Sequence, residues 1–458
     1  MTEPREAALK YAHENVERFL KDLKELASIP SVSTDLIHKE DIQRAANWLA
    51  ARLHALGAMN VQIMPTPGHP VVYGELPTGN SKAATVLIYG HYDVQPAEPL
   101  ELWESPAFEP TQRGENIYAR GVSDMKGQVL VSMNAIESIV RTSQLPVNVK
   151  FLFEGEEEIG SPHLGSFIAE HKVLLASDFC LNLDAGILGA DIPSITYALR
   201  GLAYFELRVR GPAHDLHSGS FGGVVHNPAQ VLCELIAGMH DERGRVTLPG
   251  FYDSVGALDP EERAELARLP MGEDYFLRNS GAPALDGEEG YTPAERVGAR
   301  PTLEVNGLLS GFTGEGSKTV LPATAMAKIS MRLVPDQDPD QVYRQLIQYL
   351  EAKAPNTVRW EVIPMAGSPA SIADRNLPSL VAFRDALQQV WGKRPVFKRE
   401  GGSVPVVTQM QQLLGIDSII GGFGLPDDGA HAPNEKLHLP TWYRGIDTII
   451  HFFFNLKN

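Results

Sequence analysis

The chain has 458 residues, of which 43% are hydrophobic and 21% are charged, and its formal net charge is -17. This length exceeds what one hydrophobic core usually serves, so we expect two domains. The negative charge argues against nucleic acid or an anionic membrane as a partner, because both are bound through clustered Lys and Arg. No apolar run approaches membrane-spanning length, the first residues contain no apolar signal core, and Cys180 and Cys233 form no metal or redox spacing. We therefore expect a cytoplasmic protein.

The first part of the chain alternates between helical and strand patterns. Apolar residues at helical spacing predict helices over residues 4–28 and 39–56, and Gly57 is a typical C-terminal cap for the second helix. Further elements are indicated by a helical pattern at 124–140 and by short apolar runs, typical of strands, at 85–90, 147–153 and 179–183. This alternation predicts an α/β domain with a mostly parallel sheet and helices on both faces.

The pattern changes near Arg200, where alternation of period two indicates an edge-like strand over residues 202–211. The rest of this region indicates a smaller α+β unit. It contains a second strand, at 324–335, and two helices, at 227–240 and 339–353. The segment 241–300 is rich in Pro, Gly and acidic residues, so we expect loops and short helices there.

From about residue 375 the first pattern resumes. It comprises a helix to Trp391, strands at 395–400 and 416–423, and a helix from Ser403. We therefore expect one α/β domain, 1–200 and 375–458, interrupted by an inserted α+β domain, 201–374.

Acidic and histidine residues follow the predicted strands of the α/β domain. They are His91, Asp93, Asp124, Glu154, Glu156, Glu157, Glu158, Asp184, Asp427, Asp428 and His431. Ligands of open α/β sheets bind where the carboxyl ends of strands leave the sheet. Imidazoles and carboxylates converging there suit zinc, with two ions sharing a bridging carboxylate. Period two places Asp93 on the side of His91, where it could brace the imidazole.

Each of these residues also has an ordinary structural explanation. Asp124 could be a helix N-cap, a histidine after a strand could be a structural hydrogen-bonder, and the glutamate run could be a solvated face. Asp427 and Asp428 could be turn residues before a glycine. The coincidence of five such features at predicted strand ends of one domain favours a site.

Other catalytic motifs are missing from the sequence. No G-x-S-x-G segment occurs, which argues against a serine hydrolase of that type. An H-E-x-x-H motif begun at His13 fails because its fifth position is Glu17. The glycine-rich segment 311–319 has Ser317 where a phosphate-binding loop requires lysine.

Eight segments, in their order along the chain, resemble those of the M20 metallopeptidases. The likeness is greatest to the carnosinase and cytosolic non-specific dipeptidase branch and spans about residues 30–440. The segments are GHYDVQP, RGVSDMKGQ, EGEEEIGS, DLHSGSFGG, KTVLP, RLVP, EGGS and DDGAH-x-x-NEKL.

The resemblance implies a site with two zinc ions, for which manganese or cobalt could substitute. It implies that Asp124 bridges the ions, with His91 and Asp184 on one of them. It places Glu158 and His431 on the other ion. Two further roles are implied for neighbouring acids: Asp93 orients His91, and Glu157 is the general base.

The resemblance also implies a substrate site and an assembly. The implied substrate contacts are His217, Thr319, Arg332 and Ser403. His217 would reach the active site of a partner subunit, so we expect a homodimer formed through the inserted domain, acting as a lid and dimerisation domain. Ser403 precedes a predicted helix, whose free N–H groups suit a substrate carboxylate, and Arg332 can add a forked contact.

The expected function is hydrolysis of the amide bond of dipeptides or short peptides with a free C-terminal carboxylate. Glu157 would take the proton of a metal-activated water and pass it to the leaving amine, while His217 would help to stabilise the oxyanion. An N-acyl-amino-acid deacylase shares this chemistry and stays an alternative. A non-catalytic metal-bound scaffold is a second alternative, against which Glu157 argues, since a scaffold needs no general base.

Overall fold

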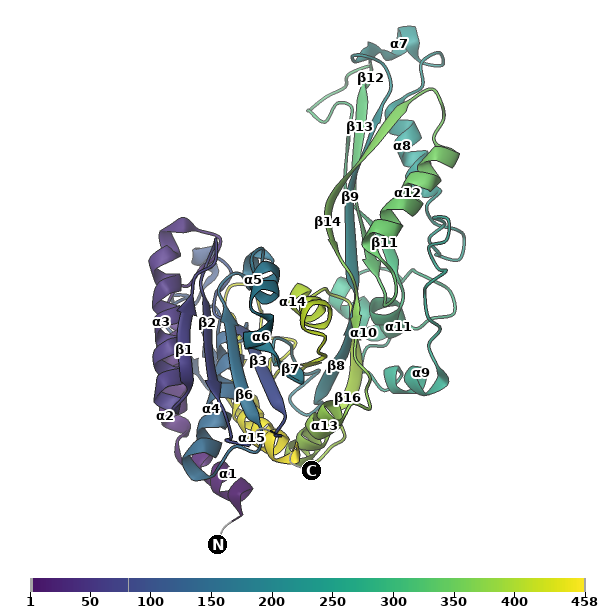
Figure 1. Cartoon of the computed structure of the whole chain (residues 1–458). Helices are drawn as coiled ribbons and strands as arrows, with labels where there is room; N and C mark the ends of the chain where they lie inside the picture. The colour runs from purple at the N-terminus through teal and green to yellow at the C-terminus, as the bar shows by residue number, and fades with distance from the viewer. Residues whose placement is uncertain (1–2, 81, 457–458) are drawn as a thin grey trace. The chain divides into compact units, whose positions relative to one another are not determined.

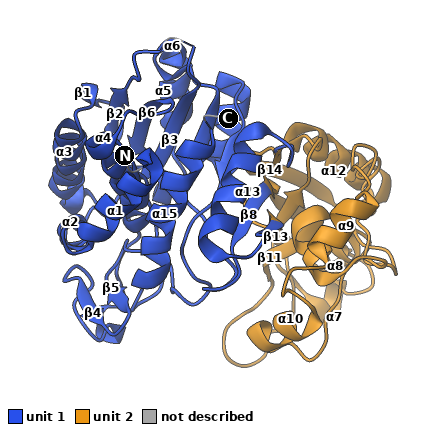
Figure 2. Ribbon diagram, turned by 90° about the horizontal axis from the view of Figure 1, so that it is seen from below, with its two compact units in different colours: residues 1–197, 373–397, 405–458 blue, residues 198–372, 398–404 orange. Residues whose placement is uncertain are grey.

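Two units make up the chain in the computed structural model, which describes residues 3–80 and 82–456. Unit 1 consists of Met1–Tyr197, Ala373–Phe397 and Pro405–Asn458, and unit 2 of Ala198–Ile372 and Lys398–Val404 (Figure 2). The second crossing between the units differs from our expectation. Residues 398–404, which include Ser403, belong to unit 2 rather than to the α/β unit.

The sheet of unit 1 has the strand order β1-β2-β6-β3-β7-β17-β8 (Figure 1). Its strands are β1 Met59–Met64, β2 Val71–Leu76, β3 Thr85–His91, β6 Asn148–Glu154, β7 Phe179–Asn182, β8 Ser194–Leu199 and β17 Ser418–Ile420. The central strands β6, β3, β7 and β17 run parallel, whereas β1, β2 and β8 join through antiparallel pairs. The predicted parallel sheet is therefore confirmed for its centre.

Helices cover both faces of this sheet, with α1 and α15 on one face and α5 and α6 on the other (Figures 1 and 2). The helices of unit 1 are α1 Pro4–Glu14, α2 Val16–Ala27, α3 Lys39–Leu56, α4 Lys126–Thr142, α5 Leu164–Glu170, α6 Lys172–Leu175, α13 Pro378–Trp391, α14 Pro405–Gln409 and α15 Leu439–Asn455. A small sheet is formed by β4 Thr111–Arg113, β5 Asn116–Tyr118 and β18 Lys436–His438. Within residues 3–80 and 82–456, every helix is too short or too polar to span a bilayer.

The helix predicted over residues 4–28 is broken in two. The break lies at Asn15, whose backbone leaves the helical region and whose side-chain Nδ2 donates to the carbonyl of Tyr11 at 2.9 Å. A side chain that bonds its own backbone competes in this way with helix continuation. The helix over 39–56 is confirmed, and Gly57 caps it with a φ of 85°.

Unit 2 is built on an antiparallel sheet with the strand order β11-β13-β9-β14. Its strands are β9 Gly201–Arg210, β11 Thr302–Ser310, β13 Thr324–Leu333 and β14 Arg359–Ser368, with β10 Leu216–His217 and β12 Val320–Leu321 as a separate short pair. Its helices are α7 Ser218–Phe221, α8 Pro228–Ala237, α9 Pro260–Leu266, α10 Glu273–Ser280, α11 Pro293–Ala299 and α12 Pro339–Lys353. Near the unit boundaries the chain forms β15 Ser371–Ile372 and β16 Val396–Glu400.

The strand predicted at a sheet edge lies at the centre of this sheet. β9 pairs with β13 on one side and with β14 on the other. Its alternating pattern has another cause, since side chains such as Phe205 and Leu207 enter the core with residues of α8 and α12, while the opposite face is partly exposed. A sheet covered on one face alternates in every strand, whether at the edge or in the centre.

Candidate metal centre

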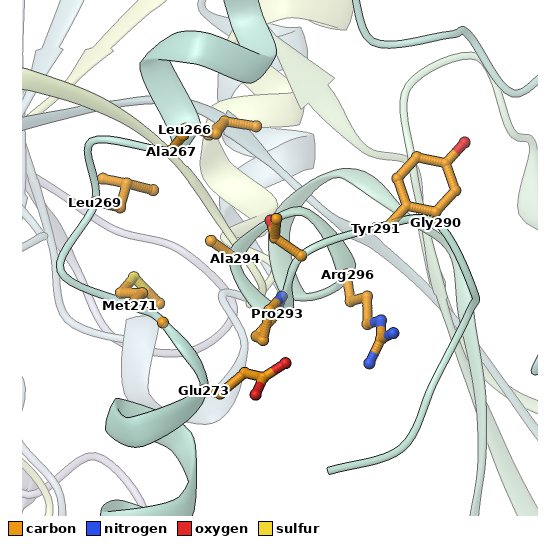
Figure 3. A pocket seen from close by; sticks show the side chains of 12 residues that line it. Leu266, Ala267, Leu269, Met271, Glu273, Gly290, Tyr291, Pro293, Ala294 and Arg296 are labelled. Carbon is orange, nitrogen blue, oxygen red and sulfur yellow. The ribbon is translucent and has the colours of Figure 1, made fainter.

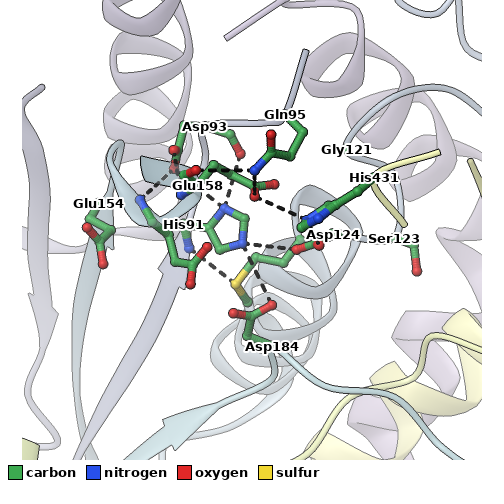
Figure 4. Close-up of polar contacts among 12 residues, drawn as sticks. His91, Asp93, Gln95, Gly121, Ser123, Asp124, Glu154, Glu158, Asp184 and His431 are labelled. Carbon is green, nitrogen blue, oxygen red and sulfur yellow. Dashed lines mark hydrogen bonds and ion pairs between the residues drawn. The ribbon is translucent and has the colours of Figure 1, made fainter. Parts of the chain in front are cut away.

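Neighbouring parallel strands bring the predicted metal ligands to one edge of the unit 1 sheet. β3 ends at His91, β6 ends at Glu154, and β7 ends at Asn182, two residues before Asp184. β3 runs parallel to both β6 and β7, so the three carboxyl ends meet at the same edge. Figure 4 shows His91 among the side chains gathered there.

The Asp124 carboxylate lies between two imidazoles. Its Oδ1 is 3.1 Å from Nε2 of His91, and its Oδ2 is 2.9 Å from Nε2 of His431 (Figure 4). The alternative role as a helix cap is wrong, because α4 begins at Lys126 and has Met125 at its N-cap position without a side-chain cap. Asp124 therefore directs one oxygen to each histidine.

Two more carboxylates complete the cluster on opposite sides of Asp124. Asp184 Oδ1 lies 3.7 Å from Nε2 of His91, and Glu158 Oε2 lies 3.1 Å from Nε2 of His431. The glutamate run is therefore not a solvated face, and the side chain of Glu158 is only 3% exposed. The structure brings together all five residues that the sequence predicts as metal ligands.

His431 reaches the cluster from a strained turn. Its φ is 63°, in the left-handed region that residues other than glycine rarely adopt. Such backbone strain costs of the order of 1–3 kcal/mol and persists only where the surrounding contacts impose it. Unlike the fully buried His91, His431 is exposed, so this side of the cluster is open.

Asp93 supports the cluster in a different way from the one expected. Nδ1 of His91 lies 3.1 Å from the backbone carbonyl of Asp93, closer than the 3.5 Å to the Asp93 carboxylate. A carbonyl only accepts, so Nδ1 carries the proton and Nε2 presents its lone pair to the cluster. The Asp93 carboxylate instead accepts the backbone N–H groups of Glu157 and Glu158 at 3.2 and 3.0 Å.

The cluster carries an excess of negative charge. Burial raises the pKa of the Glu157 carboxyl to about 8, and the neighbouring carboxylates add to this shift. Burial also raises the pKa of Asp184. Hydrogen bonds to Asp124 and Glu158 raise the pKa of His431 to about 10. Hydrogen bonds to His431 and His91 instead lower the pKa of Asp124, although burial opposes this shift. Protons are thus retained on Glu157, Asp184 and His431, which is the response of a site that lacks positive charge.

The spacing of the donor atoms fits bound cations. Four donor atoms at about 2.1 Å around a tetrahedral zinc ion lie about 3.4 Å from one another. The distances of 2.9–3.7 Å in the cluster bracket that value. Within the described residues two overlapping groups could hold an ion, one of His91, Asp124 and Glu158 and one of His91, Glu157 and Asp184. Carboxylate and imidazole donors suit zinc, manganese or cobalt.

Two supporting residues escaped the sequence analysis. Gln95 donates Nε2 to Glu158 Oε2 at 2.9 Å, and it continues the period-two series of His91 and Asp93, which was the available signal. Glu435 is fully buried and accepts the backbone N–H of Asp124 at 3.1 Å. Asp428 combines a turn role with a tertiary contact, since its Oδ2 accepts from both Leu425 N and Ser123 Oγ.

The four predicted substrate contacts all lie in unit 2, where they form two pairs. His217 and Thr319 adjoin at the β10–β12 pair, where Ser218 N donates to the Thr319 carbonyl at 3.1 Å. Arg332 Nη1 donates to the Ser403 hydroxyl at 3.1 Å, and that hydroxyl donates to the Arg200 carbonyl at 2.6 Å.

The two pairs lie at opposite ends of β13. The β10–β12 pair adjoins the Thr324 end, where Gly211 N donates to the carbonyl of Ala323, and Arg332 is next to the last residue of the strand (Figure 1). At about 3.3 Å per residue, the eight steps from Thr324 to Arg332 span about 26 Å. A dipeptide extends about 7 Å, so one such substrate cannot touch both pairs of the same chain.

Unit 2 has several open cavities, among them the following two. One has a volume of about 890 Å³ and includes Arg200 and Arg332 in its lining. The other, of about 490 Å³, lies among residues such as Leu266, Met271 and Tyr291 (Figure 3). All of the sequence-predicted site residues are described, and none of them lines the second cavity.

A comparison with known protein families identifies the family of the chain. The model of peptidase family M20/M25/M40 matches residues 87–455. The chain belongs to this family. It is a metal-dependent hydrolase, and the resemblance seen in the eight sequence segments is confirmed.

Relatives match over nearly the whole chain. The Cys-Gly metallodipeptidase of Candida albicans is 32% identical over 95% of this chain and 94% of the relative. The human Beta-Ala-His dipeptidase is 30% identical over 98% of this chain and 92% of the relative. Among solved structures, an M20 family metallo-carboxypeptidase from Sulfolobus solfataricus has a TM-score of 0.83 and 34% identity, covering 96% of this chain and 99% of the other. Human carnosine dipeptidase 1 has a TM-score of 0.78 and 29% identity, covering 99% and 98%.

The geometry predicts different losses for adjacent glutamates. We expect Glu157→Ala to retain both metals and the fold but to lose roughly 10²–10⁴-fold in turnover, the usual contribution of a positioned acid–base group. Glu158→Ala should weaken one metal instead, because its carboxylate faces His431. Elemental analysis and kcat measurements on the two variants check this.

Glu156→Gln provides the matched control within the same run. Glu156 pairs with Nδ1 of His163 at 2.9 Å and accepts the backbone N–H of His69, so this variant should keep its metals and its turnover. An exchange of phenotypes between the Glu157 and Glu158 variants would contradict the assignment.

Proposed function

We propose that this protein is a two-zinc dipeptidase that cleaves the amide bond of dipeptides or short peptides with a free C-terminal carboxylate. The observation that carries the proposal is the Asp124 carboxylate, which directs one oxygen to each of two histidines. Ions held 3.5–4 Å apart in two-metal hydrolases are commonly bridged by such a group. The relatives named Cys-Gly metallodipeptidase and Beta-Ala-His dipeptidase support dipeptides as substrates.

The proposed ligand sets follow the two sides of Asp124. One ion would be held by His91, Asp124 and Asp184, and the other by Asp124, Glu158 and His431. Each set leaves room for water or substrate, as catalytic zinc sites do.

Cys180 and Cys233 are free, in keeping with a reducing compartment, so we propose a cytoplasmic location.

When bound, the two ions supply a nucleophilic hydroxide near neutral pH and polarise the scissile carbonyl. Glu157 moves the proton. Its carboxylate lies with His91 and Asp184 in one donor group, and the burial that raises its pKa to about 8 suits a base that must also release its proton. Glu157 would take the proton of the attacking water and pass it to the leaving amine.

Arg332 and Ser403 are proposed to bind the terminal carboxylate of the substrate. Among the described residues, the Arg332 guanidinium donates to the neutral Ser403 hydroxyl. Arginine has five N–H donors in a fork that matches a carboxylate, so several stay available to a ligand. The cavity of about 890 Å³ gives a ligand access to Arg332.

A homodimer is proposed to complete each active site. His217 and Arg332 lie too far apart in one chain to contact the same dipeptide, so His217 would act on substrate bound by the partner. β11 offers a surface for the contact, because it is an edge strand and its side chains Val305, Leu308 and Leu309 are 41%, 57% and 56% exposed. A two-fold interface would use this surface on both subunits and exchange both histidines.

Metal removal should abolish activity. We expect chelation to inactivate the protein and zinc, manganese or cobalt to restore it, because the proposed reaction needs a water activated by metal ions held in the carboxylate and imidazole cluster. Metal content by elemental analysis, measured alongside turnover, checks the prediction. Full activity with fewer than two metals per chain would contradict the two-metal proposal.

Substrate choice should depend on the terminal carboxylate. We expect dipeptides such as Cys-Gly and β-Ala-His to be cleaved and their C-terminal amides to lose about 10- to 100-fold in kcat/KM, the equivalent of a charge-assisted hydrogen bond of 1.5–3 kcal/mol. Arg332→Met should remove this difference. Faster cleavage of N-acetyl- or N-succinyl-amino acids than of dipeptides would identify a deacylase instead, and no cleavage of any of them would identify a scaffold.

The shared site predicts recovery of activity in mixed dimers. His217→Ala and Glu157→Ala should each be nearly inactive alone. In a hybrid dimer, the chain carrying His217→Ala retains its own Glu157 and receives an intact His217 from its partner, so one of the two sites is whole. Subunit exchange should therefore restore turnover, measured on mixtures whose hybrid content is known by native mass spectrometry.

His226→Ala is the control for this experiment. His226 is another histidine of unit 2, and its Nδ1 lies 2.7 Å from the Thr357 hydroxyl, so its loss should leave activity unchanged. A mixture that contains hybrids and stays inactive would mean that His217 acts within its own chain.

A further inference from the structure

A buried carboxylate outside the metal cluster uses both of its oxygens. Glu435 is 0% exposed and lies four residues after His431. Its Oε1 accepts the backbone N–H groups of Ser123 and Asp124 at 2.9 and 3.1 Å. Its Oε2 accepts the backbone N–H of Gly121 at 2.9 Å and Nη1 of Arg120 at 2.8 Å. This carboxylate is thus fully satisfied by one short loop.

That loop, residues 120–124, carries Asp124 into the cluster. It precedes α4 and has no regular secondary structure to hold it. Of its five backbone N–H groups, those of Gly121, Ser123 and Asp124 end on Glu435, while those of Arg120 and Val122 bond backbone carbonyls. Most of the loop's backbone N–H groups, including that of Asp124, therefore bond one side chain that is distant in sequence.

The same segment that supplies Glu435 also supplies His431. Residues 428–436 are tied to the loop a second time by Asp428, which accepts from Ser123 Oγ at 2.8 Å. Asp428 also receives the backbone N–H of Lys436 at its carbonyl, which closes the segment on itself. The separation of 2.9 Å between Asp124 Oδ2 and His431 Nε2 is thus set by the contacts between the loop and this segment.

We propose that Glu435 is a positioning residue, which holds the bridging carboxylate Asp124 in register with His431 and so sets the metal affinity of the two-metal site. The inference rests on the proposed function, because it assumes that Asp124 binds both ions. A simple buried ion pair with Arg120 would occupy only one oxygen, whereas the other oxygen holds the amides of Ser123 and Asp124. Residues that orient metal ligands from behind typically contribute 10- to 100-fold in metal affinity.

Glu435→Gln tests the proposal with almost no change in shape. The glutamine retains one oxygen, and its NH2 group must face two donors in either orientation, either Arg120 and Gly121 or Ser123 and Asp124. We expect about 10- to 100-fold weaker zinc binding by the full-length protein, measured by competition with a chromophoric chelator. We also expect an altered visible absorption spectrum of the cobalt-loaded protein, which reports ligand geometry.

Glu137→Gln is the matched control. Glu137 lies in α4 of the same unit, its side chain is 4% exposed, and it accepts from Arg18, Arg52 and Tyr11. This variant also removes a buried carboxylate with arginine partners, so its metal-free form should melt earlier. Its zinc affinity and cobalt spectrum should equal those of the wild type, which separates general destabilisation from loss of positioning.

The outcomes distinguish this inference from the proposed function. Wild-type protein that binds fewer than two zinc ions per chain would overturn both. Wild-type protein with two ions, together with a Glu435→Gln variant of equal zinc affinity and unchanged cobalt spectrum, would overturn the inference alone. If Glu435→Gln does not fold, Glu435→Asp replaces it, since it retains the charge but is one methylene too short to reach all four donors. Its zinc affinity should also fall, and an unchanged affinity would overturn the inference.

Discussion

The proposed two-metal site depends on one carboxylate held between two imidazoles. A carboxylate can serve two cations only if each oxygen faces a different set of ligands, and Asp124 meets this condition with His91 on one side and His431 on the other. The cost is the crowding of Asp184, Glu157 and Glu158 around it. Burial, and after it repulsion between these carboxylates, raises the pKa of Glu157 and Asp184 and favours any bound cation. The crowding of buried carboxylates thus both favours metal binding and destabilises the ionised acids when no metal is bound.

The sheets of the two units distribute their candidate functional residues differently. Parallel strands bring the ends of β3, β6 and β7 to one edge, so residues from separate chain segments gather there within a few ångströms. The antiparallel sheet of unit 2 does the opposite, because its long strands keep the His217 pair and the Arg332 pair at opposite ends.

Sequence patterns predicted the features that depend on nearby residues. Apolar periodicity predicted α3 with its cap at Gly57 and the strand that ends at His91. The acidic and histidine residues that follow the strands predicted the cluster. The central position of β9 was not predictable, because an alternating pattern reports a covered face and not the presence of neighbours. Glu435 was also missed, since its partners lie more than 300 residues away and no local pattern connects them.

The run of three glutamates shows how backbone geometry separates residues that are alike in sequence. Glu157 begins a 3₁₀ turn, Glu157–Ile159, in which successive side chains diverge by about 120°. Glu156 consequently pairs with His163, Glu157 lies with His91 and Asp184, and Glu158 faces His431. The Asp93 carboxylate fixes the turn by accepting two of its N–H groups. One buried aspartate therefore holds the turn in which Glu157 and Glu158 take different partners.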